Sequence, residues 1–431
     1  MLINRPKYLE KLKELQDKPS LVKVITGARR CGKSKVLELF RNHLNDIGIA
    51  SNRIQNINFE EIENDEYTDY KKLYNHILKS SQPTVMNYIF LDEIQLVPNW
   101  FKTVNSLRLK NNMDIYVTGS NAKMLDDDLH NEFGGRWMEI KMMPLSFKEF
   151  MDFQNEKSEE YKKTLGFPIS AIKEFTYMPG EYNTYVVQGG FPEIFEFNGN
   201  QKLIKDYLSN TIYRDTIQRD IIKKYKLPYV TKLDDVARFV FENIGSETSL
   251  LNIEKSLTAS GRKVDSETVG NYIQWLRDCF MIYRCERYDI KGKKLLSTNA
   301  KYYTVDSGLR YAILGHQDSD IGATLENIVY LELLRRGYTV YTGKIGKKIE
   351  IEGKEVQLEV DFVAEKNGSR EYYQVCWTIL GNEKILKREY GSLEEIQDNY
   401  PKYLITMDVG NGGQNGIKRI NALDWLIDKS E

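Results

Sequence analysis

A phosphate-loop pattern near the amino end constrains the fold of this chain more than any other feature. The β-branched run Val22–Ile25 precedes Gly27-Ala-Arg-Arg-Cys-Gly32-Lys33-Ser34, and Val36, Leu37 and Phe40 then recur at helical spacing. In a strand, loop and helix of this kind, backbone N–H groups at the helix N-terminus converge on a phosphate. The sequence therefore predicts an α/β nucleotide-binding domain.

Within this loop, each residue type has a separate task. The glycines permit close backbone approach, Lys33 adds a point charge at the β and γ phosphates, and Ser34 offers its hydroxyl to magnesium. The predicted nucleotide contacts are Gly27, Ala28, Arg29, Arg30, Cys31, Gly32, Lys33, Ser34 and Lys35. The alternative is a chance glycine turn, and the full pattern in its strand-to-helix context argues against it.

A second apolar run ends in two acids. Tyr88–Leu91 reads as a buried strand and is followed by Asp92 and Glu93. Asp92 would hold magnesium through water, and Glu93 would polarise the attacking water as a general base. Acids at a strand end are also ordinary polar termini. The phosphate loop upstream favours the catalytic interpretation.

A third run, "MDIYVTGSNAKML", ends in Ser120 and Asn121. On a strand next to the acidic one, either side chain could sense the γ-phosphate. A polar turn that caps the following helix explains the same two residues. Both interpretations stay open at this point.

Composition excludes several classes of protein. The chain has 431 residues, 41% of them hydrophobic and 29% charged, and a net charge of -1. This predicts a globular protein of about three domains, without a signal peptide or membrane span, in the cytoplasm. The four cysteines form no CxxC pair, so neither a zinc site nor a disulfide framework is expected. A near-neutral charge also argues against a surface that binds nucleic acid everywhere.

The order of "ITGARRCGKS", "IFLDEIQ", "VTGSNAKML" and "GGRWMEIKMMPLSFKEF" resembles the bacterial and archaeal AAA+ superfamily ATPases that carry a C-terminal domain of unknown function with a nuclease-like fold. The resemblance covers nearly the whole chain and implies ATP and Mg²⁺. It implies that Arg136 stabilises charge on the γ-phosphate, in cis or from a neighbouring subunit of a homo-oligomer. It also implies that Arg5 lies near the point where the nucleotide enters. An arginine after Gly-Gly is otherwise a common surface residue.

Four segments follow from these patterns and from the resemblance. They are a P-loop AAA+ core at 1–150, a helical lid or linker at 151–227, a winged-helix domain at 228–310 and a PD-(D/E)xK nuclease-like α/β domain at 311–431. In the lid, Arg214 and Arg219 are candidate inter-subunit or phosphate contacts. A solvated charged face explains both arginines equally simply, and we favour it.

Three helical patterns and two strand-like runs joined by "IKGKKL" indicate the winged helix. The turn residues Lys291, Lys293 and Lys294 could contact DNA phosphates without reading sequence. Winged helices also serve as protein-interaction modules, so a protein partner is the alternative.

The last segment carries a nuclease-like pattern that lacks its lysine. Restriction-type nucleases use a helix glutamate, a strand aspartate and an acid-x-lysine strand around metal ions. Glu326 and Asp361 stand in the first two places, but the third reads Gln374-Val375-Cys376. We therefore predict an inactive, vestigial site. Glu326 and Asp361 are either packing residues, the interpretation we favour, or a weak magnesium site.

Two functions from different classes remain after this reading. The favoured one is an ATPase that couples hydrolysis to DNA or partner contacts of its C-terminal domains. The alternative is a slow nucleotide-gated switch that exposes these domains to a protein partner. An ATP-regulated nuclease is a third and less favoured candidate.

Overall fold

The computed structural model describes residues 3–120, 132–164, 179–227, 230–315, 320–351 and 354–428. The chain folds into two compact units. The N-terminal unit comprises Met1–Pro144, Phe191–Phe195 and Asp278–Phe280, and the C-terminal unit comprises Leu145–Gly190, Glu196–Arg277 and Met281–Glu431.

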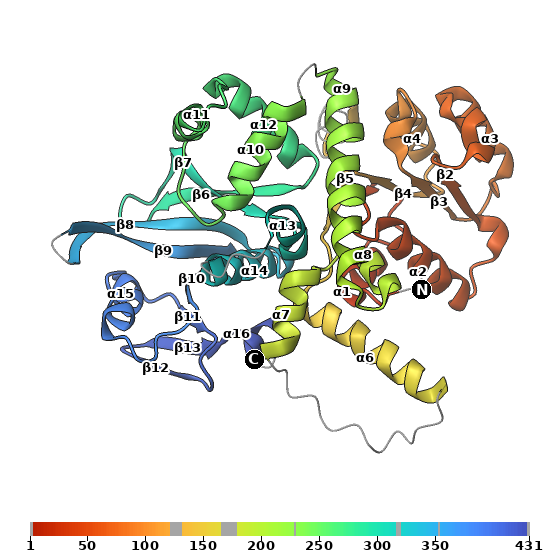
Figure 1. Ribbon diagram of the computed structural model, residues 1–431. Coiled ribbons are helices and arrows are strands. Elements are labelled where there is room, and N and C mark those ends of the chain that lie inside the picture. The colour runs from red at the N-terminus through yellow and green to blue at the C-terminus, as the bar shows by residue number, and fades with distance from the viewer. Residues whose placement is uncertain are drawn as a thin grey trace. The chain divides into compact units, whose positions relative to one another are not determined.

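The N-terminal unit contains a five-stranded sheet in the order β2-β3-β4-β1-β5, with every neighbouring pair parallel (Figure 1). Its strands are β1 (Val22–Gly27), β2 (Ile54–Asn58), β3 (Asn87–Asp92), β4 (Met113–Gly119) and β5 (Trp137–Met142). All residues of β1, β3 and β4 are buried. Continuous apolar runs of this kind are typical of parallel strands covered on both faces.

Helices cover both faces of this sheet. They are α1 (Pro6–Glu14), α2 (Lys33–Asp46), α3 (Tyr70–Ser80) and α4 (Trp100–Arg108). On one face, α3 and α4 contribute to a core with alternate residues of β1, β3 and β4. On the other face, the Phe40 ring of α2 lies 6.2 Å from Phe90 and 5.1 Å from Tyr116, measured between ring centroids. Burial on both faces fixes the strands, and so fixes the loops at their ends.

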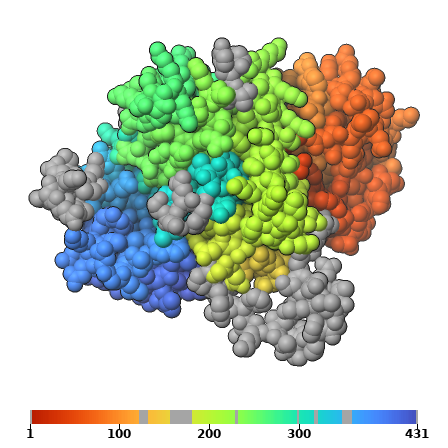
Figure 2. All heavy atoms as spheres, viewed as in Figure 1, coloured from red at the N-terminus to blue at the C-terminus, as the bar shows by residue number. Residues whose placement is uncertain are grey.

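The C-terminal unit begins with helices. They are α6 (Phe147–Thr164), α7 (Pro179–Gln188), a continuous helical segment from α8 (Gln201–Asp206) to α9 (Lys223–Tyr225), and then α10 (Val230–Glu242), α11 (Leu250–Ala259) and α12 (Ser266–Asp278). Figure 2 shows the side chains of α10, α11 and α12 in green, and α10 contacts the sheet described next through β7.

An eight-stranded mixed sheet in the order β12-β13-β11-β10-β9-β8-β6-β7 forms the rest of this unit. Its strands are β6 (Ile282–Asp289), β7 (Lys294–Thr304), β8 (Thr339–Ile351), β9 (Lys354–Lys366), β10 (Ser369–Cys376), β11 (Lys402–Thr406), β12 (Gly412–Gln414) and β13 (Ile417–Asn421). The helices α13 (Ser307–Leu314), α14 (Ile321–Arg335), α15 (Glu383–Glu394) and α16 (Ala422–Leu426) alternate with them.

The hairpin β6–β7 belongs to this large sheet, because β6 pairs in parallel with β8. The three helices and hairpin expected for a winged helix are thus present in order. However, the sheet runs across the domain boundary that the sequence placed at residue 310. Helix and strand patterns do not reveal which strands pair by hydrogen bonds, so this pairing could not be predicted from them. Residues 228–310 and 311–431 share one sheet.

A buried carboxylate holds the chain where it passes through the Gly189-Gly190 turn. Asp306 accepts hydrogen bonds from the backbone N–H groups of Gly190 at 2.7 Å and Leu309 at 2.8 Å. A Cβ atom on Gly189, whose φ is +76°, would lie 2.1 Å from the Asp306 Oδ1 atom. Burial raises the pKa of the Asp306 carboxyl to about 6.

Candidate functional site

The candidate nucleotide site lies at the carboxyl edge of the parallel sheet. The register pairs Thr26 of β1 with Gly119 of β4, and Leu91 of β3 with Val117 of β4. The strand ends of β1, β3 and β4 therefore adjoin one another. Ligands of open α/β sheets bind outside this edge.

The phosphate loop has a backbone that only glycine permits at its first position. Gly27 has φ +150°, and a Cβ atom there would lie 2.1 Å from the carbonyl oxygen of Met142. Gly32, with φ +102°, is the N-cap of α2. The loop therefore passes close to β5 and delivers the chain into a helix whose first N–H groups have no intrahelical partner.

Lys33 begins α2 and is almost fully buried. Its ammonium donates hydrogen bonds to the carbonyl oxygens of Gly27 and Ala28, each at 3.1 Å, and lies 3.9 Å from the Glu93 carboxylate. Neutral carbonyls hold it more weakly than a carboxylate would. The ammonium can therefore exchange these contacts for those of a phosphate.

Asp92 and Glu93 are fixed by the neighbouring strand. The Thr118 hydroxyl donates to the Asp92 carboxylate and accepts from the Glu93 N–H at 2.9 Å. Ser120 Oγ lies 3.4 Å from Glu93 Oε2, and Gln95 also donates to that oxygen. The structure thus brings Lys33, Asp92, Glu93 and Ser120 together; Asn121 lies outside the described residues.

Glu93 has the left-handed φ of +56°, which is rare for a non-glycine residue and common at functional sites. Thr118, which orients both acids, was missed in the sequence. A threonine in an apolar strand is ordinary, and only the pairing of β4 with β3 gives it this task.

Other loop side chains lie at the surface. Ser34 is exposed, as is Lys35, which pairs with Glu38 at 2.8 Å. Arg29 pairs with Glu60 at 2.8 Å, and Arg30 is exposed with φ +62°. The loop therefore presents its hydroxyl and backbone outward, while Arg29 is turned to a neighbouring acid.

Arg5 supports the loop from inside the fold. It is 2% exposed and donates to the carbonyl oxygens of Cys31 at 3.3 Å and Met143 at 3.0 Å. Cys31 is fully buried, and burial raises the pKa of its thiol. Arg5 is thus close to the loop, and its guanidinium contacts backbone carbonyls.

Arg136 lies at the amino end of β5, whereas the phosphate loop lies at the carboxyl ends of the strands. It directly precedes β5, whose Trp137 pairs with Val22 and whose Met142 pairs with Gly27. Six strand residues at about 3.3 Å each place it roughly 20 Å from the phosphate loop. Its own side chain is exposed and cannot span that distance. This register does not support a contact of Arg136 with the phosphate site of its own subunit.

The C-terminal unit holds a second constellation, which we call the Lys301 cluster: Lys301 with Glu326, Glu359 and Asp361. The Lys301 ammonium, on β7, lies 3.2 Å from Glu326, 2.8 Å from Glu359 and 3.6 Å from Asp361. The Tyr303 hydroxyl also donates to Glu326 at 2.6 Å. The sequence missed Lys301, because it precedes the nuclease-like pattern by about 25 residues.

The Lys301 cluster corrects one argument from the sequence. The Gln374 strand does lack a lysine, but Lys301 supplies a cation from another strand. Burial opposes its charge, yet Glu326, Asp361 and Glu359 together raise the pKa of Lys301 well above its ordinary value. Burial and then the charge of Glu326 raise the pKa of Asp361 well above its ordinary value, although Lys301 opposes this shift.

Gln374 faces the cluster and is fully engaged. Its carbonyl oxygen accepts from the Asp361 N–H at 3.2 Å, and its amide donates to the buried Glu389 of α15 at 2.7 Å. The Asp361 carboxylate accepts from the Val375 N–H at 2.8 Å. Among the described residues, no group of three or more His, Cys, Asp or Glu side chains has an arrangement that could hold a metal ion.

The remaining candidate contacts are surface residues. Lys291, Lys293 and Lys294 are exposed in and after the β6–β7 turn. Arg214 is exposed, and Arg219 lies 3.9 Å from Asp215 of its own helix. No described helix is long and apolar enough to cross a membrane.

Known proteins resemble this chain in two segments and over its whole length. Residues 19–151 match an AAA domain family, and residues 180–320 match a domain of unknown function. The second match covers part of the expected lid, all of the expected winged-helix segment and the first ten residues of the expected nuclease-like segment. The N-terminal unit therefore contains an AAA-type P-loop ATPase domain.

Two uncharacterized proteins match nearly end to end. One, from Haemophilus influenzae, is 36% identical over 430 residues, covering 99% of each chain. Another, from Methanocaldococcus jannaschii, is 27% identical over 433 residues, covering 98% of this chain and 89% of that protein. Among solved structures, the Walker-type ATPase of Pyrococcus abyssi is 15% identical, with a TM-score of 0.50 over 72% of this chain and 95% of that one. That similarity concerns the fold alone.

Proposed function

The chain belongs to the same family as the uncharacterized Haemophilus influenzae protein, with an AAA domain at its amino end, and from this premise we propose that it hydrolyses ATP with Mg²⁺ and couples hydrolysis to contacts of its C-terminal unit. The observation that carries the proposal is the meeting of three residues. Lys33 at the start of α2 lies 3.9 Å from Glu93, and Asp92 precedes Glu93 at the end of β3. The cation of Lys33, the proposed metal-binding acid Asp92 and the proposed base Glu93 thus lie at one edge of the parallel sheet.

Nucleotide binding relies on the loop backbone and on Lys33. Residues Gly27 to Lys35 surround the first turn of α2, where N–H groups and the helix dipole favour phosphate. The closeness of Gly27 to Met142 leaves the loop little freedom to collapse inward. Lys33 would exchange its two carbonyl partners for the β and γ phosphates.

The donor set fits magnesium. Ser34 offers an exposed hydroxyl, and one Asp92 oxygen is taken by Thr118 while the other has no hydrogen bond among the described residues. Mg²⁺ prefers oxygen ligands and keeps several waters, so two protein ligands suffice beside phosphate. When bound, the ion would neutralise charge that develops on the phosphates.

Glu93 is proposed as the base that orients and deprotonates the attacking water. Its contacts with Ser120 and Gln95 hold the carboxylate over the strand ends. Ser120, with Asn121 beside it in sequence, would sense the γ-phosphate. Arg136 would complete the site of a neighbouring copy, which requires a homo-oligomer.

The C-terminal unit is proposed to carry the contacts to DNA or to a protein partner, in part through a winged-helix arrangement of α10, α11, α12 and the β6–β7 hairpin. Its nuclease-like constellation is proposed to be catalytically inactive. The Lys301 ammonium is paired with Glu326, Glu359 and Asp361, which include the two acids of the nuclease-like pattern. Cluster residues thus stabilise the fold.

Turnover of ATP by the full chain tests the proposal. Wild type should release phosphate with Mg²⁺, and Glu93→Gln should bind ATP but lower turnover by about 10²–10⁴-fold. Measurements with and without duplex and single-stranded DNA decide the coupling. Stimulation supports a DNA-directed ATPase, whereas slow turnover that ignores DNA supports the nucleotide-gated switch. Turnover equal to wild type in Glu93→Gln would reject Glu93 as the base.

A further inference from the structure

Two adjoining hollows of the C-terminal sheet form a surface that the ATPase does not use. Both include Arg370 and Tyr400 in their lining, and their volumes are about 440 and 320 Å³. The larger is also lined by Tyr288 and by the turn residues Lys291 and Lys293. Hollows of this size suit a ligand of one or two nucleotides. We call them together the Tyr400 pocket.

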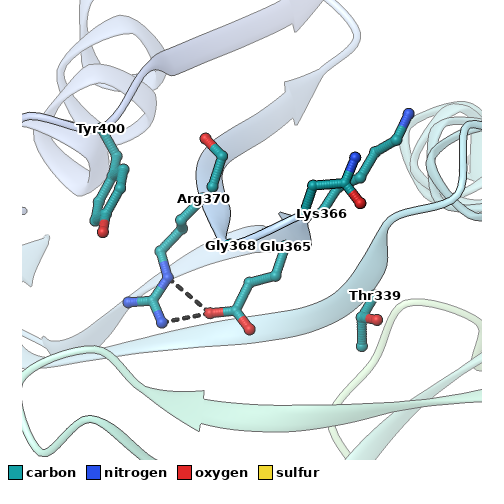
Figure 3. A pocket seen from close by; sticks show the side chains of 8 residues that line it. Thr339, Glu365, Lys366, Gly368, Arg370 and Tyr400 are labelled. Carbon is teal, nitrogen blue, oxygen red and sulfur yellow. Dashed lines mark hydrogen bonds and ion pairs between the residues drawn. The ribbon is translucent and has the colours of Figure 1, made fainter.

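Planar groups give the Tyr400 pocket a stacking platform. The guanidinium carbon of Arg370 lies 4.5 Å from the Tyr288 ring centroid and 5.8 Å from the Tyr400 ring centroid. Figure 3 shows Arg370 between Tyr400 and Glu365, to which its Nε atom donates at 2.9 Å. Arg370 is thereby fixed, while Tyr400 is 43% exposed. Tyrosine rings and guanidinium planes are the groups on which unpaired bases stack.

Cations border this platform. Lys291 and Lys293 line the larger hollow and are exposed, and neither forms an ion pair within the described part of the chain. Their turn is held against β8, because the Ile290 N–H donates to the Lys344 carbonyl at 3.0 Å. The ammonium groups are therefore presented beside the platform by an ordered turn. The platform could therefore stack a base while the two ammonium groups contact a neighbouring phosphate.

A single strand fits the Tyr400 pocket better than a duplex. Ile290, Ile345 and Ile396 give the hollow an apolar lining that a splayed base could cover. Glu395 and Asp398 in the same lining would repel a continuous array of phosphates. From these observations we propose that the Tyr400 pocket binds a single-stranded segment of nucleic acid, with a base on Tyr400 and phosphates on Lys291 and Lys293. This inference deepens the proposed coupling, and rests on it only for the link to ATP hydrolysis.

The test is binding of a fluorescein-labelled 12-nucleotide oligo(dT) to the full chain without ATP, followed by anisotropy across a salt series. Tyr400→Ala should weaken binding roughly tenfold or more, and Tyr400→Phe should bind like wild type. Lys291→Gln with Lys293→Asn, where asparagine tolerates the Lys293 φ of +50°, should weaken binding and lower the salt slope by about 1.4. Lys202→Gln with Lys205→Gln, two exposed lysines of α8, is the control with the same charge change and should bind like wild type.

Three outcomes would overturn the proposal: no binding, equal loss in the α8 control, or duplex and poly-glutamate competing as well as oligo(dT). The last would identify a general polyelectrolyte surface or a site for an acidic protein. Repeating the titration with Glu93→Gln separates the two proposals, because a failed ATPase leaves this binding unchanged. Circular dichroism of each variant excludes unfolding as the cause of lost binding.

Discussion

Two constellations in this chain combine lysine with acids, and they differ in what holds the lysine. At the phosphate loop, Lys33 is bound by the carbonyl oxygens of Gly27 and Ala28 and lies 3.9 Å from its nearest carboxylate. In the Lys301 cluster, the ammonium lies within 3.6 Å of three carboxylates. The same residue types thus make one site whose lysine can exchange its partners for a ligand and one whose lysine is already paired with carboxylates.

The difference follows from position. Lys33 begins a helix, where backbone N–H groups face outward and favour an anion. Lys301 is a buried residue of β7, the last strand in the order of the eight-stranded sheet, and unpaired buried charges are strongly disfavoured. A residue pattern that suggests catalysis therefore needs its counter-charges identified before an activity is assigned.

The largest expected effect is on stability. Lys301→Met should lower the free energy of unfolding by about 3–5 kcal/mol, because it leaves the buried Asp361 and the partly buried Glu326 and Glu359 without their cation. Urea unfolding at pH 7.5 measures this loss, and the loss should shrink at acid pH as carboxylates take up protons. Lys33→Met is the matched control. It should cost only about 1 kcal/mol, since it removes bonds to neutral carbonyls, while abolishing ATP binding. Equal losses of unfolding free energy in Lys301→Met and Lys33→Met would contradict the proposed difference between the two lysine sites.

Arg136→Ala tests whether the open site is completed by another subunit. Turnover should fall roughly 10³-fold with ATP affinity nearly unchanged, because the arginine would act on transition-state charge. Mixing Arg136→Ala with Glu93→Gln should restore part of the activity, since each variant supplies what the other lacks. Absence of recovery in co-assembled subunits would refute action in trans.

A buried acid held by backbone N–H groups offers a third case. The pKa of Asp306 is raised from 3.8 to about 6, so the folded chain binds more protons than the unfolded chain between these pH values. Stability should therefore fall as pH rises from 3.8 to about 6, by at most about 3 kcal/mol. The contribution of the Asp306 carboxyl is the difference in the free energy of unfolding between wild type and Asp306→Asn, measured by urea unfolding at each pH. A difference that stays constant over this range would contradict the raised pKa.

The smallest expected effect concerns Cys31. Burial raises the pKa of its thiol, so little thiolate exists at pH 8 and reagents reach it poorly. Mass spectrometry after brief iodoacetamide treatment should find Cys31 unmodified in the native chain and alkylated in urea. Rapid native alkylation would show that the loop is less closely packed against β5 than the structure indicates.

The sequence indicated which residues meet at the phosphate loop better than it indicated those of the Lys301 cluster. Gly27 to Ser34, Asp92 and Glu93 are adjacent in sequence to the strand ends that position them, so local patterns were enough. The partners of Glu326 and Asp361 come from β7, and no local pattern connects residue 301 with residue 361. Long-range pairing also joined β6 to β8 across the expected domain boundary. The position of Arg136 could not be predicted for the same reason, because only the strand register reveals that it lies at the amino end of β5.

A thermal-shift titration tests most directly the claim that one site is open and the other closed. Mg²⁺ with ATP should raise the apparent Tm of wild type and Glu93→Gln, by the equivalent of about 2.7 kcal/mol at a hundredfold excess over Kd, and should leave Lys33→Met unmoved. Mg²⁺ alone should leave wild type unmoved. The account would be contradicted by a wild-type Tm that ignores Mg²⁺ with ATP, or by a shift with Mg²⁺ alone that disappears in Asp361→Asn.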